Sequence, residues 1–123
     1  MNVSEIDHLV INVSDVEKSL AWYTDMLGLS AVRADEWRAG QVPFPSVRIN
    51  HGFIIDLMAL DRTGDNVDHF CLVVDRDDVD AVVTDSRFDI IEGPVARWGA
   101  KGVARSVYVT DPDGNQVELR SYD

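Results

Sequence analysis

The chain carries one pattern of ionisable residues twice, and this duplication constrains its fold more than any other feature. His8 and His69, each preceded by an aspartate, open two apolar runs that lie 61 residues apart. Asp56 and Glu118 lie 62 residues apart in two further segments that resemble each other. Imidazoles and carboxylates in strand interiors are costly to bury unless something binds them. The duplication therefore predicts two similar modules and a bound divalent cation.

Length and composition favour one compact domain. The chain has 123 residues, of which 46% are hydrophobic, enough to bury a core. We expect a single domain over residues 1–123, with modules at about 1–60 and 68–123 and a polar linker at 61–67.

Charge and segment composition exclude several classes of protein. The net charge of -11 repels phosphate backbones and argues against nucleic-acid binding. No apolar run has the length of a membrane span, and the N-terminal residues lack the basic and apolar regions of a signal peptide. The single cysteine, Cys71, suits a reducing compartment, so we expect a cytoplasmic protein. We expect Cys71 itself to be a small core residue, since no positive neighbour is evident to form a thiolate.

The first module reads as a strand, a helix and three further strands. A strand is expected over 6–13, and Ser14 then caps a helix with Glu17 three residues further on. The apolar face of that helix consists of Val16, Leu20, Tyr23 and Leu27, and Gly28 ends it. Strands are expected near 30–33, 46–50 and 53–60, with a proline-containing loop at 41–45.

The second module repeats this order. A strand is expected over 68–74, followed by a helix over 77–86 with Val79, Val82 and Val83 facing inward. Strands follow near 88–92, 104–110 and 115–121. His51 has no partner in the repeat and is expected at the surface. The prediction is an α+β fold with the order βαβββ twice.

The turn of the last hairpin fixes its register. Residues 111–115, Asp-Pro-Asp-Gly-Asn, fit a three-residue loop with Gly114 as the left-handed bulge residue. Asp111 then pairs with Asn115, and three residues further from the turn on each strand Tyr108 pairs with Glu118 on one face of the sheet. Arg120 shares that face. The same alternation places Asn12 beside His8, Met58 beside Asp56, and Cys71 beside His69.

At these motifs the chain resembles the vicinal oxygen chelate superfamily, which includes glyoxalase I, methylmalonyl-CoA epimerase, fosfomycin-resistance transferases, extradiol dioxygenases and bleomycin-resistance proteins. The resemblance covers essentially the whole chain and rests on Asp7-His8-Leu9-Val10, the helix end from Ala21-Trp22-Tyr23 to Leu27-Gly28, Asp68-His69-Phe70, and residues 111–119. It implies paired βαβββ modules whose curled, mixed sheet forms a cup around a metal. The stretch from Glu92 to Gly102 is expected to be a loop joined to the final hairpin, and it is similar to a small virulence-type, glyoxalase-domain subgroup.

The resemblance also implies the site residues. His8, His69 and Glu118 match the metal ligands common to the metal-dependent members. Asp56 occupies the place of a fourth ligand that is normally glutamate; because aspartate is one methylene shorter, it is expected as a base or a water-mediated ligand. Asn12, Met58 and Arg120 are predicted to line the substrate site.

Two reactions remain open. The run from Tyr108 to Glu118 fits the signature of extradiol dioxygenases, with Tyr108 as an acid or orienting group, although Gly99–Lys101 replaces the histidine that precedes that signature. Two histidines and one carboxylate suit non-haem Fe(II), with positions left for substrate and dioxygen. The favoured interpretation is an Fe(II)-dependent oxygenase that acts on a phenolic or enolic small molecule.

The runner-up is an isomerase or lyase that uses Ni(II), Zn(II), Co(II) or Mn(II), with Asp56 as the base. A glutathione substrate is disfavoured, because Asn12 and Leu60 replace the arginine and asparagine that the similar glyoxalases use. Arg48, Arg105 and Arg120 remain as arginines that could substitute. A non-enzymatic binder of a drug or metabolite is the third possibility. Small members of the superfamily are usually homodimers, and Trp22, Trp37 and Phe53 offer apolar surface for an interface.

Overall fold

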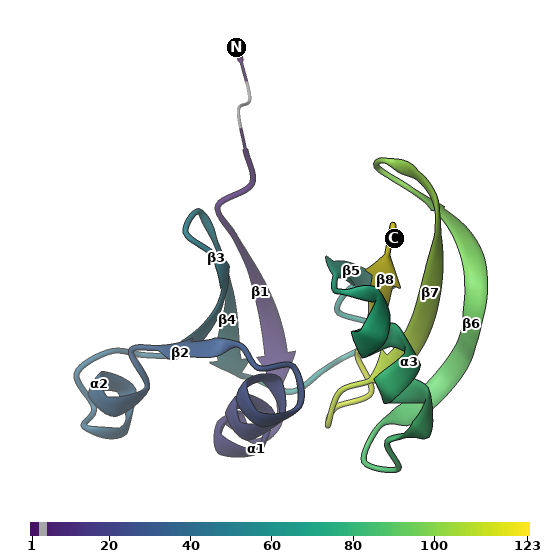
Figure 1. Cartoon of the computed structure of the whole chain (residues 1–123). Helices are drawn as coiled ribbons and strands as arrows, with labels where there is room; N and C mark the ends of the chain where they lie inside the picture. The colour runs from purple at the N-terminus through teal and green to yellow at the C-terminus, as the bar shows by residue number, and fades with distance from the viewer. Residues whose placement is uncertain (3–4) are drawn as a thin grey trace. The chain divides into compact units, whose positions relative to one another are not determined.

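The computed structural model describes residues 1–2 and 5–123 and divides the chain into two compact units, Met1–Asn66 and Val67–Asp123 (Figure 1). The division falls inside the predicted linker at 61–67. Each unit holds one of the two predicted modules, and each is described by itself below.

Unit 1 contains a four-stranded mixed sheet in the order β1-β4-β3-β2. Its elements are β1 (His8–Val13), α1 (Val16–Ala21), the π-helical η1 (Trp22–Met26), β2 (Ser30–Val32), α2 (Ala34–Arg38), β3 (Ser46–Asn50) and β4 (Phe53–Ala59). β1 runs parallel to β4, and the other pairs are antiparallel. The strands confirm the predicted order, whereas the short helix α2 was not expected.

Helix α1 begins one residue later than the sequence suggested. Asp15, not Ser14, is the N-cap: its backbone is extended, and its side chain accepts the N–H of Lys18 at 3.0 Å. Both residue types cap helices well, so composition alone could not choose between them. The prediction of Ser14 was therefore wrong by one position. Gly28 ends the helical segment with a φ of 68°, as expected.

The two faces of the unit 1 sheet differ in polarity. Ile11, Val13, Ile55 and Leu57 are completely buried on one face, where α1 packs against β4. Because side chains alternate along a strand, the opposite face receives His8, Asn12, Asp56 and Met58. The register also places Asn12 opposite Met58, a cross-strand pair that was not predicted. We call this second surface the site face of unit 1.

Unit 2 contains a second four-stranded mixed sheet in the order β5-β8-β7-β6. Its elements are β5 (Phe70–Val73), α3 (Arg76–Thr84), β6 (Asp89–Gly99), β7 (Gly102–Thr110) and β8 (Gln116–Ser121). β5 runs parallel to β8, and α3 packs on β6, β7 and β8 (Figure 1). Val79 and Val82 are buried beneath α3, but Val83 is 40% exposed. Val83 was wrongly expected inside, because it lies one helical step beyond the buried face.

The hairpin of β6 and β7 is longer than predicted. A strand over 88–92 and a loop through Gly102 were expected, yet β6 continues to Gly99. The register shifts on either side of Glu92, so that Gly93 and Pro94 form an irregularity in the strand. Regular pairing of β6 with β7 resumes at Val95. Gly93 approaches β7 so closely that an added Cβ would stand 2.6 Å from the carbonyl oxygen of Ser106. A Gly-Pro pair that resembles a strand end in sequence is therefore a bulge inside a strand.

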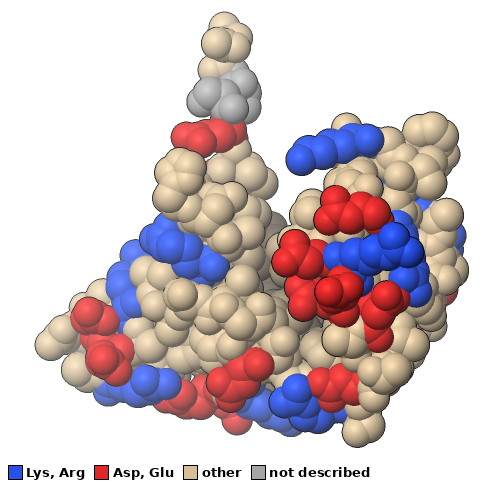
Figure 2. Space-filling view, in the orientation of Figure 1, with Lys and Arg blue, Asp and Glu red and all other residues tan. Residues whose placement is uncertain are grey.

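The final hairpin follows its predicted register. The N–H of Asp111 donates to the carbonyl of Asn115 at 2.9 Å, and Gly114 has a φ of 78°. Tyr108 lies opposite Glu118, as expected from the turn. The surface of α3 carries acidic and basic side chains side by side (Figure 2), and there Arg105 pairs with Asp80. No helix among residues 1–2 and 5–123 is long and apolar enough to cross a membrane.

Candidate functional site

Glu118 is the centre of a polar cluster in unit 2. The residue is only 3% exposed, and several polar side chains approach its carboxylate. Ser106 Oγ donates to Oε1 at 2.5 Å, Arg120 Nη1 lies 3.5 Å from Oε1, and His69 Nε2 lies 3.3 Å from Oε2. A buried carboxylate is tolerated only with such partners. Oε1 is thus held by the protein, whereas Oε2 faces the imidazole.

The second nitrogen of His69 is fixed by the residue before it. Nδ1 of His69 lies 2.6 Å from Oδ2 of Asp68, and a carboxylate there accepts the Nδ1 proton. This leaves the Nε2 lone pair for a ligand, which is how a carboxylate orients a metal-binding histidine. If two ligand atoms each lie about 2.1 Å from one cation, they are about 3.0 Å apart at a ligand–metal–ligand angle of about 90°. At the tetrahedral angle they are about 3.4 Å apart. The 3.3 Å between His69 Nε2 and Glu118 Oε2 fits such a shared ion.

Tyr108 packs against this pair. Its ring meets that of His69 edge-on, with the centroids 5.5 Å apart and an interplanar angle of 74°. Burial raises the pKa of the Tyr108 phenol, and the charge of Glu118 raises it further. The phenol therefore stays protonated at neutral pH and is a hydrogen-bond donor beside the predicted ligands.

Cys71 lies on the same strand face as His69 and is exposed, so the expectation that it is a core residue was wrong. Alternation along β5 places it on the site side of the sheet, away from α3. Burial of the sulfur and the charge of Glu118 raise the pKa of the Cys71 thiol to about 11. Arg120 is a positive neighbour that was not expected from the sequence; it lowers the pKa, but burial and Glu118 outweigh it, so the thiol is protonated at neutral pH.

Arg120 is buried behind Glu118. Its side chain is 5% exposed and donates to the backbone carbonyls of Arg97 at 2.8 Å and Trp98 at 3.2 Å. The Tyr122 ring lies 4.9 Å from its guanidinium carbon. Gly99 makes this packing possible, because an added Cβ would stand 1.9 Å from Nη1. Arg120, predicted as a substrate-binding residue, thus links Glu118 to the backbone of β6. Its buried side chain leaves little surface that a substrate could contact.

Unit 1 repeats the histidine arrangement. Nδ1 of His8 lies 2.7 Å from Oδ2 of Asp7, and the side chain of His8 is half-exposed. This hydrogen bond is the main cause of a raised pKa at His8, and the charge of Asp56 adds to it. Each module therefore presents one imidazole whose Nδ1 is engaged and whose Nε2 is available.

The carboxylate of unit 1 has its own polar partners. Asp56 is 5% exposed, and Ser46 Oγ donates to its Oδ1 at 2.6 Å. Arg33 Nη2 donates to Ser46 Oγ at 2.8 Å and lies 3.7 Å from Asp56 Oδ1. Neither Ser46 nor Arg33 was expected as a site residue from the sequence. The repeat contains a signal for Ser46, because a shift of 62 residues maps Ser46 and Asp56 onto Tyr108 and Glu118, which also lie opposite each other.

The structure brings two of the three predicted ligands together, since His69 and Glu118 meet in unit 2. The third, His8, lies in unit 1 on the same sheet face as Asp56, the predicted base or water-mediated ligand. Among residues 1–2 and 5–123, no group of three or more histidine, cysteine or acidic side chains encloses a metal position. Asn12 and Met58 lie half-buried on the site face of unit 1, as predicted.

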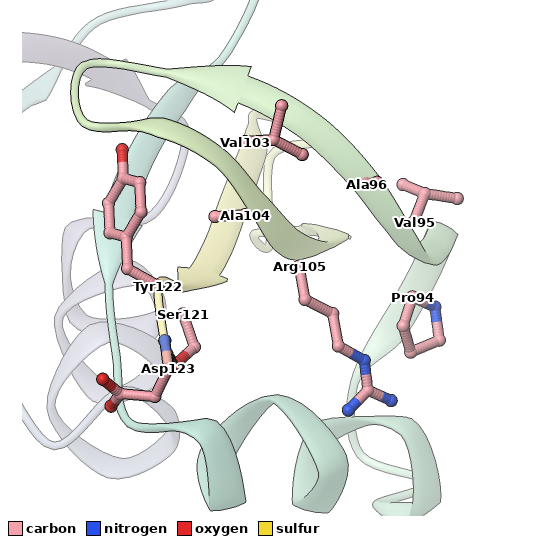
Figure 3. Close-up of a pocket in the computed structure, with 9 residues that line it drawn as sticks. All are labelled: Pro94, Val95, Ala96, Val103, Ala104, Arg105, Ser121, Tyr122 and Asp123. Atoms are coloured by element: carbon pink, nitrogen blue, oxygen red, sulfur yellow. Dashed lines mark hydrogen bonds between the residues drawn. The ribbon is translucent and has the colours of Figure 1, made fainter.

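A cavity of about 410 Å³ lies elsewhere in unit 2 (Figure 3). Its walls come from β6, β7 and the end of the chain: Pro94, Val95, Ala96, Val103, Ala104, Arg105, Ser121, Tyr122 and Asp123. Arg105 points toward α3 and Tyr122 points the other way. The walls include none of the predicted site residues, so this cavity is separate from the Glu118 cluster.

Comparison with known proteins places the chain in a family. The model of the glyoxalase/bleomycin resistance protein/dioxygenase superfamily matches residues 5–119. The chain belongs to this superfamily. Most members of the superfamily are metalloenzymes that act on small molecules, and divalent metals are common among them.

Two similar proteins of this superfamily cover nearly the whole chain. Virulence protein STM3117 of Salmonella typhimurium is 34% identical over 127 residues, which cover 99% of this chain and 87% of that protein. Glyoxalase domain-containing protein RDO1 of Mycosarcoma maydis is 36% identical over 127 residues, which cover 99% of this chain and 70% of RDO1. Both agree with the predicted subgroup.

Solved structures confirm the glyoxalase fold. The crystal structure of STM3117 matches with a TM-score of 0.76 and 30% identity, over all of both chains. An integron cassette protein from V. cholerae matches with a TM-score of 0.77 and 29% identity, over 100% of this chain and 98% of that one. The α+β class and the repeated βαβββ order are therefore confirmed.

Proposed function

We propose that the chain is a divalent-metal-dependent enzyme that uses Fe(II) and dioxygen to oxidise a phenolic or enolic small molecule with two neighbouring oxygens. The observation that carries this proposal is the spacing of His69 Nε2 and Glu118 Oε2, with the Tyr108 phenol beside them. His8 is the predicted third ligand. A bound Fe(II) would supply Lewis acidity and electrons for dioxygen.

The other residues of unit 2 have supporting roles in this proposal. Asp68 holds the tautomer of His69, and Ser106 and Arg120 hold Oε1 of Glu118. Tyr108 donates a hydrogen bond or a proton to a substrate oxygen, because its raised pKa keeps the phenol protonated.

A metal-dependent isomerase or lyase that uses Ni(II), Zn(II), Co(II) or Mn(II) is the second candidate. The observation that favours it is the nearly buried carboxylate of Asp56 on the site face of unit 1. Ser46 occupies Oδ1, whereas Oδ2 has no hydrogen-bond partner in the part of the chain that the structure describes. Oδ2 could then take a proton from a carbon next to a carbonyl group.

Metal dependence and two variants separate these candidates. Protein purified without a chelating tag is loaded with Fe(II) or Zn(II) and assayed for oxygen uptake and product formation against phenols and ketoaldehydes. For an oxygenase, only Fe(II) supports turnover, and Tyr108→Phe slows it by roughly tenfold or more because a proton donor is lost. Tyr122→Phe is the matched control and should keep most of the activity. Full anaerobic activity with Zn(II) or Ni(II), abolished by Asp56→Asn, would instead establish the isomerase or lyase.

Metal binding is tested separately from turnover. One divalent ion per chain is expected, and His69→Ala should abolish tight binding because an imidazole donor is lost. Unchanged stoichiometry and affinity in this variant would disprove the ligand assignment. A metal-free protein that binds an aromatic ligand with full affinity would indicate a non-enzymatic binding protein.

We also propose that the protein is a cytoplasmic homodimer. Trp22, Trp37 and Phe53 are only partly buried within the chain and could contribute to an interface. Light scattering should then give twice the chain mass of 13.7 kDa. A mass of one chain at micromolar concentration would refute the dimer.

A further inference from the structure

The tip of the β6–β7 hairpin, residues 97–102, is connected to Glu118 by one side chain. Arg120 donates through Nη2 to the carbonyl of Arg97 and through Nη1 to the carbonyl of Trp98. The same Nη1 lies 3.5 Å from Oε1 of Glu118. β7 lies between β8 and β6 in the sheet, so the side chain reaches past one strand to make these contacts. A single buried guanidinium therefore joins the hairpin tip to the carboxylate.

Gly99 provides the space for this guanidinium. An added Cβ would stand 1.9 Å from Nη1 and 2.3 Å from Cζ of Arg120, and 2.7 Å from the hydroxyl of Tyr122. The backbone of Gly99 does not have a positive φ, so it is not in the left-handed conformation that favours glycine. Glycine at this position is therefore explained by the close approach of Arg120 and not by a turn.

The guanidinium is enclosed, but its hydrogen bonding is incomplete. The Tyr122 ring centroid lies 4.9 Å from Cζ of Arg120, and Tyr122 points toward the hairpin tip (Figure 3). Nε of Arg120 is buried and has no hydrogen-bond partner among residues 1–2 and 5–123. A buried donor without an acceptor is unfavourable, and an apolar side chain often replaces a buried charge without loss of stability. Stability alone therefore does not account for an arginine at this position.

The donors on one carboxylate oxygen determine which oxygen is left for a metal. Ser106 and Arg120 both contact Oε1 of Glu118, whereas Oε2 lies 3.3 Å from Nε2 of His69. Hydrogen-bond partners of this kind orient a ligating carboxylate, and their replacement lowers metal affinity by about 10- to 100-fold. The connection through Arg120 therefore brings the packing of the hairpin tip to bear on a predicted metal ligand.

We propose that Arg120 is a positioning residue for Glu118, and that the packing of the hairpin tip on Arg120 sets the direction of Oε2. Displacement of the guanidinium turns Oε2 away from His69 and weakens metal binding, although no ligand has been changed. All the contacts behind this inference lie within unit 2. The inference rests on the function proposed above in one respect, namely that Glu118 binds a divalent metal.

The affinity of the whole chain for Zn(II), measured by competition with a chromophoric chelator, tests this inference. Gly99→Ala displaces the guanidinium without changing Glu118 or Ser106 and should weaken Zn(II) binding by about tenfold or more. Arg120→Lys keeps the charge but not the planar donors and should have a similar effect. The double variant should bind Zn(II) about as tightly as Arg120→Lys alone, because the connection to the tip is already lost.

The absorption spectrum of the Co(II)-loaded protein is a second measurement, because its bands depend on the arrangement of the ligand atoms. The spectrum should change in Gly99→Ala and in Arg120→Lys. Gly28→Ala is the matched control, since it also replaces glycine by alanine and destabilises the chain, but it lies in unit 1 and has no contact with Arg120. Its Zn(II) affinity and Co(II) spectrum should match those of the wild-type protein. Circular dichroism of the metal-free variants verifies that each one is folded.

Wild-type Zn(II) affinity in folded Gly99→Ala would overturn the inference, as would an equal loss in Gly28→Ala. Additive losses in the double variant would overturn the connection through Arg120. If Gly99→Ala does not fold, Arg120→Lys decides, and wild-type affinity in that variant overturns the inference. Each of these results leaves the metal function standing. Failure of the wild-type protein to bind Zn(II) or Co(II) would overturn the proposed function, and this inference with it.

Discussion

Asp111 should be the residue whose loss most weakens the hairpin that positions Glu118. Its side chain is 5% exposed and accepts three hydrogen bonds within the turn. Oδ1 accepts the N–H groups of Asp113 at 2.9 Å and Asn115 at 2.8 Å, and Oδ2 accepts the Asn115 amide at 2.8 Å. Asp111→Ala leaves these three donors without that acceptor.

The structure sets the size of the expected loss. Hydrogen bonds to a charged group contribute about 1.5–3 kcal/mol each, and bonds that share one acceptor do not add fully. The turn is near the surface, so water can replace part of them, and a total loss of about 3 kcal/mol in the free energy of unfolding is expected. For a chain of 123 residues this lowers the Tm by about 10 °C. Asp111→Asn keeps an oxygen for the two backbone donors and should lose about half as much.

Urea denaturation followed by circular dichroism measures these differences. Asp61→Ala is the control, because Asp61 is an exposed aspartate of the linker and its loss should change stability by less than about 0.5 kcal/mol. If Asp111→Ala is no more destabilising than Asp61→Ala, the turn does not depend on this carboxylate and the reasoning is refuted.

Three further perturbations have expected outcomes. Hydrogen bonds from Arg87 lower the pKa of Asp85 from 3.8 to about 2, so the stabilisation that they give is present above about pH 3.8 and is lost as the pH falls through 2. Carboxyl NMR titration should show this midpoint, and Arg87→Gln should return it toward 3.8; an unchanged midpoint would contradict the pairing. Gly28→Ala should cost about 1 kcal/mol in urea denaturation, because Gly28 has a φ of 68° and no neighbour within 4 Å of an added Cβ, so a neutral result would argue against the left-handed conformation. Leu57→Ala should cost about 3 kcal/mol, because Leu57 is fully buried; a loss below about 1 kcal/mol would contradict its place in the core.

Features that depend on nearby residues could be predicted from the sequence. The turn at 111–115 set the register of β7 and β8, because few turn types fit a proline and a left-handed glycine at these positions. Alternation along the strands then assigned Tyr108, Glu118 and Arg120 to one face, and the repeat assigned His8 and His69 to matching strands. These relations follow from backbone geometry over a few residues, and the structure confirms the pairing of Tyr108 with Glu118.

Features that depend on partners far along the chain were decided by the tertiary structure. The sequence gives no sign that Arg33 takes a left-handed backbone and reaches Ser46, 13 residues away. It also could not show that Arg120 is buried against carbonyls of β6, or that Cys71 is exposed. Burial and hydrogen-bond partners depend on which strands become neighbours and on what covers each face. Residue type and periodicity therefore set the order of the elements and the candidate ligands, whereas packing between distant segments decides which of these side chains remain available for a ligand.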